Sequence, residues 1–375
     1  MSRTIIDVDA HFTESLDDMI PYFDEPWKSN LRHGEGFSTA FFLPGGSGDR
    51  GVGGRIQRHS MSAEEYAQDG PSGHAPTGYQ EHYNADDQSM TPEDIPQMMD
   101  FLDLDAMIAL SHSMLALPSI KGADTRAIEL ARGAISYLLD EVVDPDEGVY
   151  TALPMPWQDV EGALELFDEF KDERGICAIC LITAGAEPPL GNRTYEPIYA
   201  AAEAADLPVI FHTGGSGLDN YHLKGYEKFI ETHTLGFLEG NMSQITSLVI
   251  QGIPEKFPDL DIIFQESGIM YIPMIMYRLD EEYLKRPSEA PLLNRRPSEY
   301  IKEMYFGTQP MEQPPDLEYF EKTLEVIDAP SQLMYASDFP HWDFDRPSVI
   351  EEIPFLSEAE KDRILGGNAR GVFGI

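Results

Sequence analysis

The stretch QLMYASDFPHWD, residues Gln332 to Asp343, carries the feature that decides the fold. Its first half is apolar and is typical of a buried strand. Yet Asp338 and His341 follow immediately, where a loop without a function would not require them. An acidic residue at the end of a single core strand does not by itself indicate a functional site. It indicates one only if other strands end in similar residues. The other strand-like runs of the chain therefore decide how this one is interpreted.

Short apolar runs alternate with amphipathic stretches along most of the chain. Eight such runs are found: TIIDVDAH from Thr4, DAMIAL from Asp105, YTALPM from Tyr150, ICAICLI from Ile176, PVIFH from Pro208, DIIFQE from Asp261, EMYFGT from Glu303 and QLMYASD from Gln332. Most are apolar throughout, as expected for parallel strands that are covered on both faces. The stretches between them, such as DTRAIELARGAISYLLDEVV, repeat apolar residues at helical spacing. This alternation predicts an α/β fold, a (β/α)₈ TIM barrel that forms one domain over residues 1–375.

One region departs from this rhythm. Residues 33–90 include PGGSGDRGVGGRIQRHS and have no sustained period. A connection of this length inside a compact fold is usually a lid or a binding loop. We therefore expect a lid-like insertion after the first strand.

Composition limits the classes of function. The chain has 375 residues, and its formal net charge of −40 comes from 66 acidic and 26 basic residues. Such an acidic surface suits a high-salt cytoplasm and disfavours nucleic acid and anionic membranes as partners. No apolar run approaches the ~20 residues needed to span a bilayer, and the start MSRTIIDVDAHF does not resemble a signal peptide. We expect a soluble, cytoplasmic protein that acts on a small molecule.

The two cysteines, Cys177 and Cys180, form a C-x-x-C pair, which suggests redox or metal chemistry. However, they lie within an apolar run that is typical of a buried strand. Residues three apart on a strand point to opposite faces, and no helix begins there to lower a thiol pKa. We interpret both cysteines as packing residues.

Functional residues of a (β/α)₈ barrel lie at the carboxyl ends of its strands. The first run ends with Asp9 and His11, which are two apart and therefore share a face. The fifth ends with His212, the sixth with Glu266 and the eighth with Asp338. Carboxylates and imidazoles are metal ligands, and four strand ends that carry them predict a metal site at the mouth of the barrel.

Several of these segments resemble the amidohydrolase-related family. The segments are IIDVDAHF, LPVIFHTGG, FPDLDIIFQESGIMYIPMIMYRLD, LMYASDFPHWD and the closing ILGGNARGVFGI. Within the amidohydrolase superfamily, this branch contains aminocarboxymuconate semialdehyde decarboxylase and related aromatic acid decarboxylases. The resemblance covers most of the chain outside the insertion and implies a metal-bearing (β/α)₈ barrel.

The resemblance also implies roles for individual residues. Asp9 and His11 match the first-strand ligand pair of the family, His212 matches the fifth-strand ligand, and Asp338 matches an aspartate that binds metal and relays a proton. Two positions depart from the pattern: Asp9 replaces the usual histidine, and Glu266 stands where the decarboxylases usually have a histidine that handles substrate. The fourth strand has no lysine, which excludes the carbamylated-lysine bridge of the binuclear hydrolases.

The ligand set leaves three reactions open. The favoured one is hydrolysis of a carboxylate- or amide-bearing substrate by a metal-activated water, with Asp338 and Glu266 as catalytic groups. The second is oxygen activation by a dinuclear iron or manganese site, which the resemblance to monooxygenases of the family implies and in which Glu266 and His233 complete the ligands. The third is non-oxidative decarboxylation, which Glu266 disfavours because a second carboxylate repels the substrate unless it is protonated or metal-bound. Zinc fits the site, and its oxygen-rich composition favours manganese or iron, as one or two ions.

Three residues near the strand ends are candidate substrate contacts. His112 follows the second strand, and His341 and Trp342 follow Asp338 and would form the wall beside it. The resemblance also leads us to expect a homo-oligomer, or a heteromer with a homologous subunit.

Overall fold

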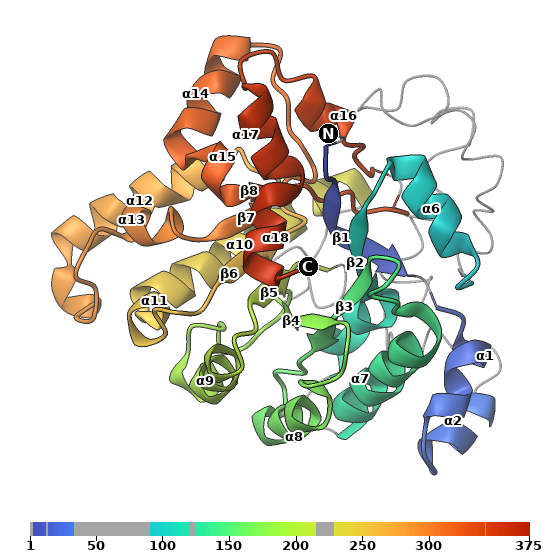
Figure 1. Ribbon diagram of the computed structural model, residues 1–375. Helices are drawn as coiled ribbons and strands as arrows, with labels where there is room; N and C mark the ends of the chain where they lie inside the picture. Colours follow the sequence, from blue (N-terminus) through green and yellow to red (C-terminus); the bar gives the residue numbers. More distant parts are fainter. Residues whose placement is uncertain (1–2, 13, 34–90, 121–124, 215–228, 342) are drawn as a thin grey trace.

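The computed structural model describes residues 3–12, 14–33, 91–120, 125–214, 229–341 and 343–375. Its centre is a parallel sheet of eight strands in the order β1 to β8, surrounded by helices (Figure 1). The strands are β1 (Ile6–Phe12), β2 (Ala106–Ser111), β3 (Val149–Pro154), β4 (Ile176–Ile182), β5 (Val209–His212), β6 (Ile262–Gln265), β7 (Tyr305–Gly307) and β8 (Leu333–Met334). The predicted (β/α)₈ barrel and all eight predicted strands are confirmed.

Hydrogen bonds between the segment that follows β8 and β1 complete the ring. The amide of Val8 donates to Tyr335 O at 3.0 Å, and the amide of His11 donates to Phe339 O at 2.7 Å. β8 itself is short because the residues after Met334 pair with β1 only through such isolated contacts. The barrel is therefore closed by the same segment that carries Asp338.

The outer layer consists of helices on the connections between strands. The longer helices are α6 (Asp94–Leu102), α7 (Thr125–Tyr137), α8 (Val160–Phe170), α9 (Glu196–Ala204), α10 (Phe229–Ile250), α12 (Ile272–Lys285) and α14 (Leu317–Ile327). Shorter ones are α1 (Leu16–Met19), α2 (Trp27–His33), α11 (Ile253–Lys256), α13 (Pro297–Ile301), α15 (Ala329–Gln332), α16 (Ser348–Glu351), α17 (Glu358–Asp362) and α18 (Asn368–Phe373). The helix expected over 124–143 leaves α geometry at Leu138, where a π-helical turn, η3 (Leu138–Val142), continues it.

Aromatic residues show how strand alternation sorts side chains. Phe211, Phe264 and Phe306 are register partners on β5, β6 and β7, and their rings stack at centroid distances of 5.1 and 6.1 Å. They pack in the core between the strands and the surrounding helices. Because neighbouring residues on a strand face opposite sides, His212 points to the other side from Phe211, into the barrel.

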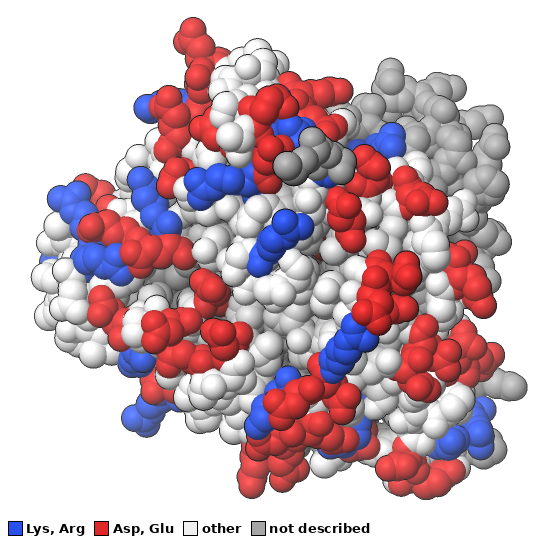
Figure 2. Space-filling view, in the orientation of Figure 1, with Lys and Arg blue, Asp and Glu red and all other residues white. Residues whose placement is uncertain are grey.

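Both cysteines are buried and free, which confirms their interpretation as packing residues. Burial raises the pKa of the Cys177 thiol, so it is not a reactive thiolate. Among the described residues, no helix combines the length and apolar character that a membrane span requires. Acidic side chains are spread over the face seen in Figure 2, as the net charge of −40 requires. The lid-like insertion was predicted for residues 33–90; His33 ends α2, and residues 34–90 lie outside the described residues, so the lid stays a prediction.

Candidate metal centre

Four predicted ligands meet inside the mouth of the barrel. Asp9 and His11 share the inner face of β1, His212 ends β5, and Asp338 follows β8. Asp9, His11 and His212 are fully buried, and Asp338 is 1% exposed. The period-two geometry of parallel strands, whose carboxyl ends share one rim, brings together residues that are far apart in the chain.

The ligand atoms lie close enough to surround one cation. His212 Nε2 lies 3.1 Å from Asp9 Oδ1, and His11 Nε2 lies 3.1 Å from Asp338 Oδ1. One ligand atom from each of Asp9, His11 and His212 lies within 4.8 Å of the others, and the same holds for His11, Asp338 and His341. Because His11 Nε2 lies 3.5 Å from Asp9 Oδ1 and 3.1 Å from Asp338 Oδ1, the two groups describe one centre.

Unpartnered polar atoms provide a test of whether this pocket fits a cation. Asp9 Oδ2, Asp338 Oδ2 and both ring nitrogens of His11 are buried without a hydrogen-bond partner. Such atoms are rare in folded proteins, because each one forgoes its hydrogen bonds with water. A cation bound among them would satisfy the carboxylate oxygens and one imidazole nitrogen, so the residues present fit a metal.

The backbone sets the orientation of His212. Its Nδ1 donates to the carbonyl oxygen of Thr213 at 2.5 Å. The Nε2 atom lies on the other side of the ring, 3.1 Å from Asp9 Oδ1, to which it donates when no cation is bound. With a cation bound, the bond from Nδ1 would keep the ring proton on Nδ1 and leave the lone pair of Nε2 for the cation. Metal-binding histidines are commonly oriented by such a second hydrogen bond.

Glu266 and Asp338 have unusual backbone conformations, with φ values of +57° and +60°. Among the described residues, the other non-glycine positions with positive φ are Asp103, Asp206 and Asp328, and they follow helices, where this conformation is common. At the end of a strand it costs energy and is found most often at functional sites. The conformation turns the chain sharply at the two strand ends from which the predicted catalytic carboxyl groups project.

Burial and like charge govern the electrostatics. Burial, followed by repulsion from Asp338, raises the pKa of Glu266 well above its ordinary value. Burial also raises the pKa of Asp338, and repulsion from Asp343 and Asp9 adds to this effect. Burial lowers the pKa of His212, but Asp9 and Glu266 reverse this effect and bring the pKa to about 9. Burial, with three neighbouring histidines, lowers the pKa of His11. The pocket thus brings together acidic groups that resist ionising side by side, and a divalent cation bound among them would favour their ionised forms.

Two further histidines form one side of the centre. The His341 ring centroid lies 4.5 Å from that of His11 and 5.5 Å from that of His112. His341 Nδ1 lies 2.6 Å from Asp338 Oδ1, so its N–H donates to that carboxylate, while its Nε2 has no partner. The sequence analysis placed His341 at the wall beside Asp338 and His112 after the second strand as a candidate substrate contact; in the structure His341 directly contacts the predicted ligand Asp338.

Glu14 is a residue of the site that the sequence analysis missed. It accepts hydrogen bonds from the Ser111 hydroxyl and from the amides of His112 and Ser113 at 3.1 and 3.0 Å. It therefore holds the turn η2 (His112–Ser119) that carries His112. Its only signal in the sequence was its position three residues after His11, at the exit from β1.

Two predicted site residues are not placed. Trp342 lies outside the described residues, and His233 lies in α10 with a side chain outside the described set. Their roles stay predictions. Glu266, by contrast, is 5% exposed, and its Oε2 lies 3.6 Å from His212 Nδ1, at the edge of the ligand cluster.

Comparison with known proteins agrees with this architecture. The sequence model described as amidohydrolase matches residues 6–375. The chain belongs to the amidohydrolase family. A γ-resorcylate decarboxylase from Polaromonas sp. (strain JS666) is 24% identical over 294 residues, which cover 74% of this chain and 85% of the relative.

Solved structures of amidohydrolases share the fold. An amidohydrolase from Mycobacterium avium subsp. paratuberculosis K-10 superposes with a TM-score of 0.72 at 18% identity, with both chains covered completely. A dihydroxybenzoic acid decarboxylase from Polaromonas sp. JS666, with bound manganese and the inhibitor 2-nitroresorcinol, gives 0.68 at 17% identity, covering all of this chain and 97% of that one. These structures share the barrel fold that the described residues of this chain adopt.

Proposed function

We propose that this amidohydrolase is a metal-dependent, non-oxidative decarboxylase of a small aromatic or unsaturated acid. The buried cluster of Asp9, His11, His212 and Asp338, with its unpartnered ligand atoms, carries the proposal of a metal enzyme. The choice of reaction is supported by the similarity to a γ-resorcylate decarboxylase, which extends over most of both sequences. The sequence analysis ranked this reaction below hydrolysis.

Asp9, His11, His212 and Asp338 would hold the cation, and manganese is supported by the decarboxylase structure that contains it. When bound, a divalent cation supplies positive charge that orients the substrate's acidic oxygens and stabilises the negative charge that develops during loss of CO₂. The protein's contribution is a buried pocket in which the proposed ligands already lie close together.

The reaction consumes one proton, because the bond from carbon to the carboxylate breaks and a bond from carbon to hydrogen forms: R–COO⁻ + H⁺ gives R–H + CO₂. Glu266 is the candidate donor, since its Oε2 is unpartnered and lies beside the ligand His212. Asp338 is the second carboxyl group, and His341 holds its Oδ1 at 2.6 Å. We assign Asp338 to holding the cation and relaying a proton, and Glu266 to protonating the substrate carbon.

Hydrolysis is the second candidate, and Glu266 is the observation that favours it. A carboxylate next to a metal-bound water can accept its proton, whereas the decarboxylases usually carry a histidine at this position. A dinuclear monooxygenase is the third candidate and needs further ligands, for which the sequence offered Glu266 and His233.

One set of assays separates the three reactions. Manganese-loaded protein is incubated with a panel of hydroxybenzoates, unsaturated acids, amides and esters, in air and under argon, with release of CO₂ and of amine or alcohol measured. We expect CO₂ release from an acid at equal rates in both atmospheres, and none from protein stripped of metal. Amine or alcohol release without CO₂ would establish hydrolysis instead, and activity confined to air would establish an oxygenase.

A further inference from the structure

Two polar side chains of α10 are completely buried against the barrel. Asn241 and Gln244 are three residues apart, so they lie on the same face of the helix, and neither is exposed to solvent. The buried residues that follow on this face are apolar, namely Ile245, Leu248 and Val249. Burying an amide side chain is costly unless its hydrogen-bonding groups find partners. The polar pair therefore indicates a specific set of contacts at this turn of α10.

Asn241 lies between the carboxyl ends of β4 and β6. Its Oδ1 accepts a hydrogen bond at 2.9 Å from the hydroxyl of Thr183, the residue that follows β4. Its Nδ2 donates to the carbonyl oxygen of Gln265 at 2.7 Å and to Ser267 Oγ at 2.8 Å. The helix approaches closely here, since a Cβ at Gly240 would lie 3.3 Å from Thr183 Oγ1. The amide thus spends its oxygen on β4 and both of its N–H bonds on β6.

The two residues that Asn241 holds at the end of β6 are the neighbours of Glu266. The backbone of Glu266 has a φ of +57°, a conformation that costs energy in a residue with a side chain. Such a conformation persists only where the surrounding structure maintains it. The bonds to Gln265 O and Ser267 Oγ restrain the chain on both sides of Glu266, so they limit the rotations that would move its carboxyl group.

The carboxyl group itself has little to hold it. Glu266 Oε2 is buried without a hydrogen-bond partner, 3.6 Å from His212 Nδ1. Where a side chain makes no hydrogen bond of its own, its position depends on the backbone from which it projects and on the packing around it. The hydrogen bonds of Asn241 therefore bear directly on where the Glu266 carboxyl group lies.

We propose that Asn241 is a positioning residue for Glu266, which sets where the Glu266 carboxyl group lies beside the proposed metal ligands. This inference rests on the proposed function, in which Glu266 protonates the substrate carbon. A proton donor must lie within hydrogen-bond reach of the atom it protonates, and a displacement of about 1 Å can lower the rate by about 100-fold. Asn241 acts through Glu266, so its removal should matter only while Glu266 can donate a proton.

The substitution Asn241→Leu removes the hydrogen bonds and keeps a side chain of similar size. We expect kcat for CO₂ release to fall by about 10–100-fold, while manganese content stays at the wild-type level because the four proposed ligands are unchanged. The matched control is Gln244→Leu, on the same buried face, which loses bonds to Thr183 O and to the Leu190 amide and none to the neighbours of Glu266. It should lower the unfolding temperature as well but keep most of kcat. Equal losses of kcat in the two variants would overturn the proposal.

A double-mutant cycle separates positioning from general destabilisation. In the Glu266→Gln background, Asn241→Leu should lower kcat by less than about 3-fold further, because the group that it positions no longer donates a proton. A loss by the same factor in both backgrounds would overturn the positioning role alone. Wild-type turnover in Glu266→Gln, or no CO₂ release by the wild type, would instead overturn the proposed function and this inference with it.

Crystal structures of the variants give a readout that does not depend on activity. We expect residues 265–267 and the Glu266 carboxyl group to shift in Asn241→Leu and to stay in place in Gln244→Leu. An unchanged Glu266 in Asn241→Leu would contradict the proposal. If Asn241→Leu does not fold, Ser267→Ala takes its place, since it removes one of the two bonds to the neighbours of Glu266. Its expected result is a smaller fall in kcat that disappears in the Glu266→Gln background; no fall, or an equal fall in both backgrounds, would count against Asn241 as well.

Discussion

The amide of Asp338 donates to the carbonyl oxygen of Asp9 at 2.7 Å. This bond both closes the barrel and sets two acidic side chains side by side in a buried pocket. Two ionised carboxylates in one buried pocket repel each other, so this arrangement favours a proton or a cation between them. The closure of the barrel and the assembly of the proposed metal centre are therefore parts of the same structure.

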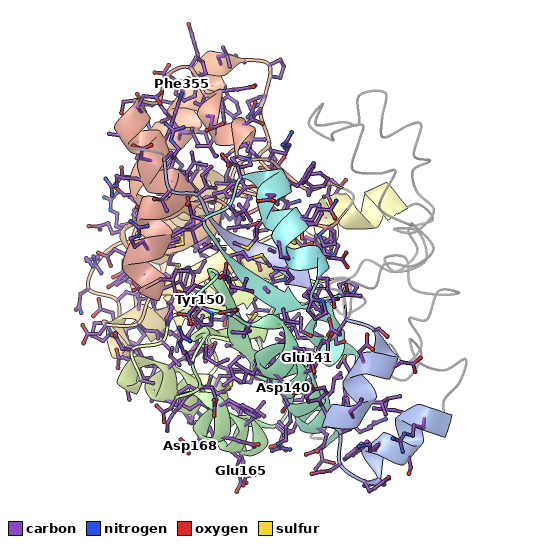
Figure 3. The ribbon with its side chains drawn as sticks, turned by 45° about the vertical axis from the view of Figure 1, so that its right-hand side comes forward. Asp140, Glu141, Tyr150, Glu165, Asp168 and Phe355 are labelled. Atoms are coloured by element: carbon purple, nitrogen blue, oxygen red, sulfur yellow. The ribbon has the colours of Figure 1, made fainter. Side chains whose placement is uncertain are left out.

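The Asp338→Asn substitution tests the role of that carboxylate. Asparagine keeps the size of the side chain but removes the negative charge, so we expect kcat to fall by about 10²–10⁴-fold. The matched control is Asp168→Asn on α8, whose side chain is 72% exposed and points away from the barrel (Figure 3). Steady-state kinetics would contradict the assignment if both variants kept wild-type kcat.

Glu266→Gln tests the proposed proton donor. Glutamine retains the shape but has no acidic proton, so we expect turnover to drop by about 100-fold or more. Metal content is measured on the same sample: an unchanged content identifies Glu266 as a proton donor, and a lost equivalent identifies it as a ligand. Glu165→Gln, exposed on α8 (Figure 3), serves as control. Unchanged turnover in Glu266→Gln would remove this residue from the mechanism.

His341 should act by positioning Asp338 through the 2.6 Å hydrogen bond. Its removal in His341→Ala is expected to lower activity by about 10–100-fold. In His341→Asn, the side-chain amide can occupy the place of Nδ1 and donate to the same carboxylate, so this variant should retain most of the activity. If the asparagine variant loses as much as the alanine variant in kcat and in metal affinity, the hydrogen bond is not what His341 contributes.

The buried carboxyl group of Asp345 predicts how the free energy of unfolding depends on pH. It accepts a hydrogen bond from the Met311 amide at 2.7 Å, and burial raises its pKa from 3.8 to about 7. The folded state then binds the proton more tightly than the unfolded state does, so this contribution to stability is present below pH 3.8 and is lost as pH rises through about 7.

Asp345→Asn removes that titration and keeps an acceptor for Met311. Relative to wild type, the variant should gain about 1–3 kcal/mol of unfolding free energy between about pH 5 and about pH 8. Denaturant unfolding at the two pH values measures this difference. An equal difference at both would show that Asp345 does not titrate between them.

Much of the fold was predictable from the sequence because buried parallel strands are apolar along their length. All eight runs are strands, and β4 begins at Ile176, the residue at which its run begins. The meeting of the candidate ligands was also predictable, because the carboxyl ends of parallel strands bring Asp9, His11, His212 and Asp338 to one rim of the barrel. The shortness of β8 was not, because it depends on contacts with β1 that no local pattern encodes.

Other features of the site depend on conformation, which residue types alone do not reveal. The positive φ angles of Glu266 and Asp338 belong to residues that usually avoid them, so the sequence gives no signal. The contact of His341 with Asp338 depends on the turn that follows the strand, and the sequence therefore indicated only a position at the wall. Glu14 was missed because it acts by accepting hydrogen bonds from the backbone amides of His112 and Ser113, a contact between distant segments that no local pattern indicates.

Metal binding measures the central claim most directly. Chain stripped with a chelator is titrated with Mn²⁺, alongside His212→Asn and His11→Asn, and with Ala200→Glu as a control for handling. We predict about one tightly bound ion per chain for the wild type and the control, and a loss of affinity of at least about 10-fold in each histidine variant. A wild type that binds no ion stoichiometrically, or histidine variants that bind as tightly as it does, would contradict a cation held at the four strand ends.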